Sequence, residues 1–358
     1  MIIRTVYFTG QGQERARELF DGWEGFHPQY REGELSDWVK ESFAWHLPLL
    51  FIGACGIAVR QIAPFVRDKT IDSPVLVMDE KGSFVIPILS GHLGGANHLA
   101  RQIARRLKAQ PVITTATDVN SLFAVDVFAS GNALRVVNRE GIRKVSSRIL
   151  DGEKISISID TTKIDVMQQP PSFIQMMPYP PMQEVDVLIG EQPQILTGSR
   201  KAAAGQASLY LAPRTLVAGM GCRRGKSGDE LLAFFQKKMQ ELGLSEEDVR
   251  AQLCAIASVD VKQDEAGLEM LAQFYHVPYL TFSAGELEAM EGQFTESAFV
   301  QSAIGVSNVC ERAAMCAAGK KGKLLLPKQA QNGMTLAVAC RPGQILAWER
   351  QQEERIWR

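Results

Sequence analysis

The chain has 358 residues, which is long for a single hydrophobic core and predicts two or three domains. Its 46% hydrophobic and 22% charged residues are typical of a folded globular protein, and its net charge of -1 excludes a general attraction to nucleic acid or to an anionic membrane. The opening MIIRTVYFTG has no charged segment followed by an apolar run, so a secretory signal is not expected there, and the most apolar run, residues 47–59, is too short to span a bilayer. Six scattered cysteines without a Cys-x-x-Cys pair fit a reducing, cytoplasmic setting.

The first part of the chain alternates strand and helix patterns. Strands are expected at RTVYFTG, at PLLFIGA, at SPVLVMDE and FVIPILS, which an EKGS turn joins, and at PVITTATD. Helices are expected at QERARELFDGW, at GIAVRQIAPFV and at GGANHLARQIARRLKAQP, where Leu99, Ile103 and Leu107 recur at a spacing of four. This alternation predicts an N-terminal α/β domain with a parallel sheet over residues 1–131.

The rest of the chain divides into a smaller middle section and a second α/β part. Residues 132–213 combine the helical REGIRKVSSRIL with strands at KISISID, EVDVLIG and SLYLAP, and the proline-rich QQPPSFIQMMPYPPM is expected to be a loop. In residues 214–345 strands and helices alternate again, with Ser227 predicted to cap a helix that Gly243 ends. Residues 346–358 are expected to form a charged tail. The predicted fold class is α/β, with two α/β domains of mostly parallel sheets joined by a small α+β middle section.

The strongest candidate site is SGHLGGANHLA, residues 90–100, where an apolar strand ends and a helix begins. Ligands bind outside the carboxyl ends of strands in open α/β sheets, and a helix N-terminus favours an anion or an oxyanion. His92 and His98 are suited to moving a proton near pH 7. The glycines that would let the backbone approach a ligand are Gly91, Gly94 and Gly95. The alternative is a tight turn whose histidines only cap or pack.

Two other kinds of chemistry are weak at this stretch. A protein-bound metal is not expected, because His92 and His98 are six residues apart with no Cys or carboxylate beside them. Ser90 precedes a glycine but lacks the Gly-x-Ser-x-Gly elbow of a serine nucleophile, so an acyl-enzyme is left open without support.

Further candidates for substrate binding follow other strands. Each has a plainer alternative as a buried small residue, a helix cap, a solvated charge or an ion pair. The candidates are Gly53, Gly56 and Arg60 in GACGIAVR (53–60), Thr114 and Thr115 in TTATDVN (114–120), Asp126 just after it, Lys262 and Glu265 in SVDVKQDEAGL (258–268), and Glu311 in VSNVCERAA (306–314).

The stretch AGMGCRRGKS, residues 218–227, looks like a nucleotide-binding loop at first. The phosphate-binding pattern needs a glycine five positions before the final Gly-Lys-Ser, and that position is Met220. Arg223, Arg224 and Lys226 supply guanidinium and ammonium groups, and guanidinium forks match carboxylates. The sequence therefore favours a carboxylate-binding loop over an ATP site, with a plain basic surface turn as the alternative.

Together these stretches resemble a known family. The segment from GACGIAVRQIAPFV through SGHLGGANHLARQIARRL to PVITTATD resembles the N-terminal region of the cobalt-precorrin-5A hydrolases of anaerobic cobalamin biosynthesis. AGMGCRRG, SVDVKQDEAGL, VSNVCERAA and NGMTLAVA resemble the small C-terminal domain of that family, which also occurs alone in aerobic pathways. The resemblance covers roughly residues 45–340.

The resemblance implies a hydrolase that opens the ring A δ-lactone of a cobalt-bearing tetrapyrrole and releases acetaldehyde. It implies no cofactor of the protein's own, because the cobalt is carried by the substrate. The expected catalytic residues are His98 or His92 as base, Asn97 with helix N–H groups for the oxyanion, and Ser90 beside them. The substrate is polycarboxylate, which gives the arginine-rich loop a purpose.

Several alternatives stay open. The chain could be a non-catalytic carrier of the corrinoid intermediate, or a nucleotide-dependent enzyme using residues 219–227. No nucleic acid or membrane partner is expected, whereas a homodimer and neighbouring cobalamin-pathway enzymes are partners that the sequence leaves open. It does not say whether the site lies within one domain or between domains.

Overall fold

A computed structural model describes residues 1–68, 72–91, 94–115, 123–190, 207–295 and 308–348. The chain forms two compact units, the first made of residues 1–120 and 264–276 and the second of residues 121–263 and 277–358. No helix among the described residues is both long and apolar enough to cross a bilayer.

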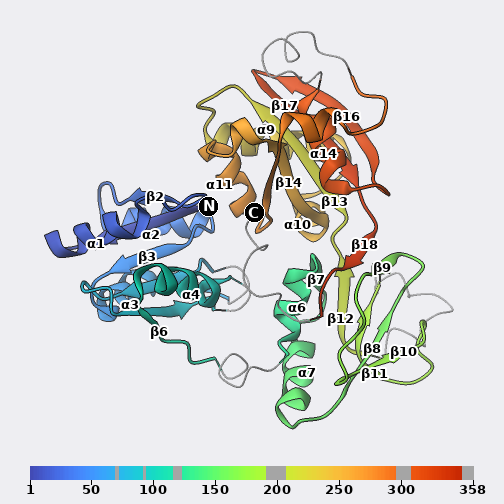
Figure 1. Ribbon diagram of the computed structural model, residues 1–358, viewed down its shortest axis with the longest axis horizontal. Helices are drawn as coiled ribbons and strands as arrows, with labels where there is room; N and C mark the ends of the chain where they lie inside the picture. The colour runs from blue at the N-terminus through green and yellow to red at the C-terminus, as the bar shows by residue number, and fades with distance from the viewer. Residues whose placement is uncertain (69–71, 92–93, 116–122, 191–206, 296–307, 349–358) are drawn as a thin grey trace. The chain divides into compact units, whose positions relative to one another are not determined.

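The first unit is built on a six-stranded sheet, blue to teal in Figure 1, with the strand order β2-β1-β3-β4-β5-β6. Its strands are β1 (Ile2–Tyr7), β2 (His27–Tyr30), β3 (Leu49–Ile52), β4 (Val75–Met78), β5 (Phe84–Leu89) and β6 (Gln110–Pro111). All neighbours pair in parallel except β4 and β5. The mostly parallel α/β fold predicted from the alternating pattern is therefore confirmed.

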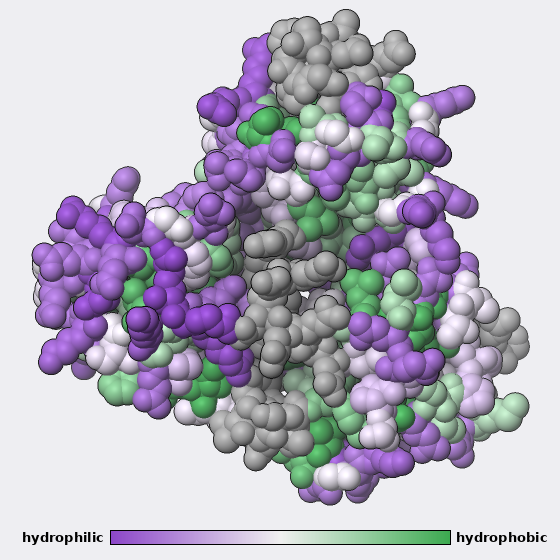
Figure 2. Space-filling model, viewed as in Figure 1, coloured by the Kyte–Doolittle hydropathy of each residue, from purple (hydrophilic) through white to green (hydrophobic). Residues whose placement is uncertain are grey.

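Helices cover both faces of this sheet, because each has one apolar side. α1 (Gly10–Phe20) and α4 (Ala96–Leu107) bury Ala16, Leu19 and Ile103 in one core. α2 (Leu35–Ala44) and α3 (Cys55–Ile62) bury Trp38 and Ala58 in another. Polar side chains, purple in Figure 2, dominate the visible surface around α1 and α2.

The antiparallel pairing of β4 with β5 determines at which edge of the sheet the candidate residues after β5 lie. Only residues 79–83 separate β4 from β5, too few for the crossover that parallel neighbours need. Val75 therefore pairs with Leu89, and Met78 with Val85. The carboxyl end of β5 lies at the edge of the sheet where β1 to β4 begin.

The second unit contains two five-stranded sheets. The first has the order β10-β8-β11-β12-β7 and the second the order β15-β14-β13-β17-β16. The strands of the first are β7 (Leu134–Val136), β8 (Ile155–Ile159), β10 (Ile174–Met177), β11 (Val185–Ile189) and β12 (Ala207–Pro213), flanked by α6 (Val125–Gly131) and α7 (Glu140–Leu150). All pairs in it are parallel except β12 with β7.

The second sheet of this unit is parallel in β13, β14 and β15, and antiparallel in β16 and β17. Its strands are β13 (Leu216–Cys222), β14 (Leu253–Val259), β15 (Tyr279–Phe282), β16 (Lys323–Gln331) and β17 (Met334–Cys340). The helices are α9 (Gly228–Glu241), α10 (Glu246–Gln252), a 3-10 turn (Asp260–Lys262), α11 (Ala266–Phe274, in the first unit), α12 (Ala284–Glu288) and α14 (Val309–Ala318). β9 (Ile164–Val166) and β18 (Gly343–Ile345) form a parallel pair.

Two local predictions have opposite outcomes. Ser227 caps α9 as predicted, in a reciprocal capping box with Glu230, and the chain leaves this helix at Gly243, whose φ is +79°. The loop predicted over the proline-rich stretch 168–182 is wrong in part, because Ile174–Met177 form β10 and pair with β8. The prolines flank these four residues, and β10 is an edge strand, where prolines are tolerated.

Candidate active site

The turn between β5 and α4 is tightly built. Ser90 has a φ of +55°, a left-handed conformation that is uncommon for a residue with a side chain. A Cβ at Gly94 would lie 2.8 Å from the carbonyl oxygen of Ser90, and a Cβ at Gly91 would lie 2.7 Å from Oδ1 of Asn97. Gly95 has a φ of +83° and precedes α4. Glycine is thus needed at positions 91 and 94 because other atoms of the protein lie close by, and at position 95 because of its left-handed backbone.

Hydrogen bonds fix the start of α4. The backbone N–H groups of Ala96 and Asn97 donate to the carbonyls of Ser90 (3.1 Å) and Gly91 (2.9 Å). The Asn97 side chain donates through Nδ2 to Oγ1 of Thr115 at 3.0 Å, and its residue is only 2% exposed. Two helix N–H groups expected to hold an oxyanion are therefore already bonded to backbone carbonyls.

The surroundings of Ser90 and His98 are not those of a free nucleophile and a free base. The Ser90 hydroxyl donates to the carbonyl of Asp72 at 2.8 Å, so its proton is directed to a backbone oxygen and not to a base. His98 lies in the first turn of α4 and is 4% exposed. His92 lies outside the described residues. Proton transfer at His98 thus requires that water reach the buried side of this turn.

The antiparallel strand β5 separates two groups of candidate residues. Gly53, Gly56 and Arg60 follow β3 and lie at the edge where β1 to β4 end, whereas Ser90 and Asn97 lie at the opposite edge. The two groups lie at opposite edges because β5 runs antiparallel to β4. Arg60 instead bonds the carbonyl of Gly56, with Nη1 at 3.4 Å. Thr114 is exposed and Thr115 contacts Asn97, so both belong to the β5 edge.

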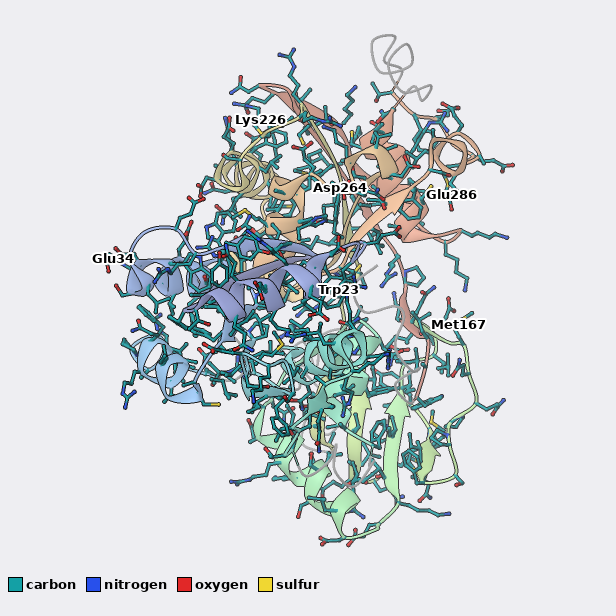
Figure 3. All side chains as sticks on the ribbon, turned by 60° about the vertical axis from the view of Figure 1, so that its left-hand side comes forward. Trp23, Glu34, Met167, Lys226, Asp264 and Glu286 are labelled. Atoms are coloured by element: carbon teal, nitrogen blue, oxygen red, sulfur yellow. The ribbon has the colours of Figure 1, made fainter. Side chains whose placement is uncertain are left out.

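Helix α11 brings further titratable groups to the edge where β1 and β2 begin. The Glu269 carboxylate is buried, and its Oε1 lies 3.3 Å from Nε2 of His27 and 3.4 Å from the amino nitrogen of Met1. The hydrogen bond to Glu269 raises the pKa of His27. Asp264, labelled in Figure 3, lies 3.5 Å from the same imidazole. Glu265, predicted to bind substrate, is the buried residue that precedes α11.

Sequence reasoning missed this group. His27 and Glu269 are separated by more than 240 residues, and neither stands in a recognisable motif. The rings of His46 and His276 also meet there, with centroids 4.5 Å apart. No three His, Cys, Asp or Glu side chains among the described residues are arranged to hold a metal ion.

In the second unit, the basic turn after β13 is not a nucleotide loop. β13 continues through Cys222, so Gly219 and Gly221 lie inside a strand and cannot curl round a phosphate. A Cβ at Gly219 would lie 1.8 Å from the carbonyl oxygen of Cys310, so this glycine allows α14 to pack closely. The P-loop alternative therefore does not fit the backbone.

The basic side chains of that turn follow neighbouring parallel strands. Arg223 and Arg224 are exposed directly after β13, and Lys262 follows the adjacent β14. Lys226, labelled in Figure 3, is paired with Glu230, with Nζ 2.6 Å from Oε1. The turn thus presents two unburied guanidinium groups at the carboxyl edge of this sheet.

The remaining two candidates have structural partners. Glu311 is 1% exposed, and its carboxylate accepts hydrogen bonds from N and Oγ1 of Thr295 and from N of Lys328, at 2.7, 2.8 and 2.6 Å. These hydrogen bonds hold the carboxylate in place at the start of α14 and leave little room for a substrate beside it. Asp126 is 8% exposed and accepts from N of Val127 near the start of α6.

Comparison with known proteins finds family matches in both the N-terminal and the C-terminal part of the chain. Residues 37–118 match the family model described as "Cobalamin synthesis G N-terminal", and residues 216–339 match "Cobalamin synthesis G C-terminus". A cobalt-precorrin-5A hydrolase of Salmonella typhimurium is 34% identical over 88% of this chain and 87% of its own length. One from Priestia megaterium is 33% identical, over 82% and 78%. Protein CobE of a Sinorhizobium species is 30% identical over 35% of this chain and 79% of its own length.

Proposed function

Because the chain belongs to the cobalt-precorrin-5A hydrolase family, and is thus a hydrolase of cobalamin biosynthesis, we propose that it opens the ring A δ-lactone of cobalt-precorrin-5A. The products would be cobalt-precorrin-5B and acetaldehyde. The cobalt arrives with the polycarboxylate tetrapyrrole, and the protein needs no nicotinamide, flavin or ATP for this reaction.

The observation that carries the proposal is the turn from Ser90 to His98. It combines a strained backbone, an imidazole and an amide whose Nδ2 is held by Thr115. Strained residues cluster at active sites because the fold must hold them there for a reason other than stability.

In the proposed reaction His98 takes a proton from water, which attacks the lactone carbonyl. The Asn97 side chain stabilises the negative charge on the carbonyl oxygen. The carbon–oxygen ester bond breaks as protonated His98 gives its proton to the departing oxygen, which leaves a ring A carboxylate and a hydroxyl on the two-carbon unit. That oxygen loses its proton, the carbon–carbon bond to the macrocycle breaks, and the macrocycle keeps the electron pair as acetaldehyde departs.

Within the second unit, the basic turn after β13 is suited to binding carboxylate groups. Arg223 and Arg224 are exposed, and Arg forks bind carboxylates in two-point contacts. We assign carboxylate binding in this unit to Arg223, Arg224 and Lys262, and we call these three residues the substrate rim. Lys226 contributes less, because Glu230 already neutralises it.

A carrier without catalytic activity is the second candidate, and the burial of His98 favours it, since a buried imidazole meets water less readily. The two candidates differ in turnover. Purified protein would be incubated with cobalt-precorrin-5A, and acetaldehyde would be followed by a coupled alcohol dehydrogenase. We expect multiple turnovers that the His98→Ala variant loses while it keeps corrinoid binding. Absence of aldehyde with intact binding would favour the carrier.

A further inference from the structure

Four arginines converge where β13 begins in the second unit. Arg214 directly follows β12, and its backbone N–H donates to the carbonyl of Ala133 at 2.8 Å, beside Arg135 on β7. Arg341 follows β17, and its N–H donates to the carbonyl of Thr215 at 2.9 Å. Arg250 comes from α10, which leads into β14. Figure 1 shows β12 running into β13 at this place, with β7 beside it.

Among the described residues, Arg135, Arg214 and Arg341 have no carboxylate partner, whereas Arg250 has one. Burial lowers the pKa of Arg214, the Cys254 thiol raises it, and the charges of Arg135 and Arg250 lower it further. No carboxylate of the described chain raises it in return. Within the described part of the chain, its guanidinium donates from Nη1 to the carbonyl of Leu253, at a long 3.5 Å. Of the other three, only Arg250 has an acidic partner within the described residues: its Nε lies 3.0 Å from Oε1 of Glu246.

The neighbouring groups do not neutralise the cluster either. Arg341 bonds the thiol of Cys254, and burial raises the pKa of that thiol, so it is uncharged near neutral pH. The Nε atom of Arg135 is buried without any hydrogen-bond partner. All four residues are half-buried, and the guanidinium of Arg214 is the one whose burial lowers its pKa.

A desolvated guanidinium without a partner is costly, and native proteins rarely keep one without an occupant. Guanidinium groups present paired N–H donors whose spacing fits the oxygens of carboxylates and phosphates. We propose that Arg135, Arg214 and Arg341 form a binding site for a small multivalent oxyanion. Arg250 remains tied to Glu246 and adds only its charge.

This site is distinct from the proposed substrate rim. Arg214 precedes the first residue of β13 and Arg223 follows its last, and seven strand residues at about 3.3 Å each separate the two by roughly 23 Å. The oxyanion site therefore stands or falls independently of the hydrolase reaction.

The test is thermal unfolding of the full chain in a low-salt buffer, with inorganic phosphate or citrate added against sodium chloride of the same ionic strength. At a concentration one hundred times the dissociation constant, we expect a rise in Tm of about 5 °C beyond the chloride value. A larger response to phosphate identifies a phosphorylated ligand, and a larger response to citrate a polycarboxylate. Equal responses to phosphate, citrate and chloride would overturn the proposal.

A charge variant separates an anion site from a structural cluster. Arg135→Met keeps the length of the side chain and removes its charge, and we expect at least tenfold weaker phosphate or citrate binding by calorimetry. In chloride alone its Tm should equal or exceed that of the parent, because repulsion is relieved. The exposed Arg143→Met is the matched control and should keep the full anion response. If Arg135→Met kept that response, or if Arg143→Met lost it equally, the site would be disproved.

Discussion

Gly91→Ala tests whether Asn97 acts in the reaction. A Cβ at position 91 would lie 2.7 Å from Oδ1 of Asn97 and 3.1 Å from its Cγ and Nδ2. Ordinary contact begins at about 3.4 Å, so the amide must move by about 0.7 Å. The backbone of Gly91 is not in the left-handed region, so alanine fits it without strain.

The expected effect is on turnover and not on folding. Misplacing a reacting group by about 1 Å can cost about 100-fold in rate, so we expect a 10- to 100-fold fall in kcat. Asn97→Ala removes the amide altogether and should cost about 10²- to 10³-fold. Because the clash is with the end of a side chain, the free energy of unfolding should change by less than about 1 kcal/mol.

The assay is acetaldehyde release by the two single variants and the double variant, with Tm measured for each. If the new methyl acts through the amide, Gly91→Ala has no further effect once Asn97 is alanine. Equal losses in both backgrounds would refute this reasoning, as would full activity of Gly91→Ala.

Three further predictions concern stability and reactivity. Gly219→Ala places a Cβ 1.8 Å from a backbone oxygen that cannot yield easily, so it should cost about 3 kcal/mol or more in a denaturant titration, and a wild-type midpoint would contradict it. His27 has a raised pKa, so its ion pair with Glu269 stabilises the fold below the unfolded pKa near 6.5 and is lost as pH rises through the folded value. With the ring 38% exposed the contribution is less than about 1 kcal/mol, and the Tm deficit of His27→Gln should be larger at about pH 5.5 than at about pH 8.5. Burial raises the pKa of Cys310 to about 11, so a thiol reagent at pH 8 should leave Cys310 unmodified in peptide mass spectra until the protein is unfolded.

The sequence pattern predicted most strands and helices because each carries its own periodicity or cap. Ser227 and Glu230 stand three residues apart, and such a spacing suffices to place the start of α9. β10 was missed because prolines surround a run of only four residues, and its strand conformation depends on pairing with β8.

The candidate site was predicted less completely, and for a topological reason. The turn at Ser90 is visible because glycine and histidine gather in one short stretch. The direction of β5 determines which edge that turn occupies, and a short connection such as residues 79–83 is the signal that could have revealed it. The grouping of His27 with Glu269, and of Arg135 with Arg214, arises only in the folded chain, because each pair joins segments far apart in sequence.

The most direct measurement follows oxygen transfer during a reaction in water enriched with oxygen-18. Attack of water on the lactone carbonyl predicts one labelled oxygen in the ring A carboxylate of the corrinoid product for each acetaldehyde released, detected by mass spectrometry. Acetaldehyde release with an unlabelled carboxylate would contradict hydrolytic opening, and so would recovery of the intact lactone after prolonged incubation with the enzyme.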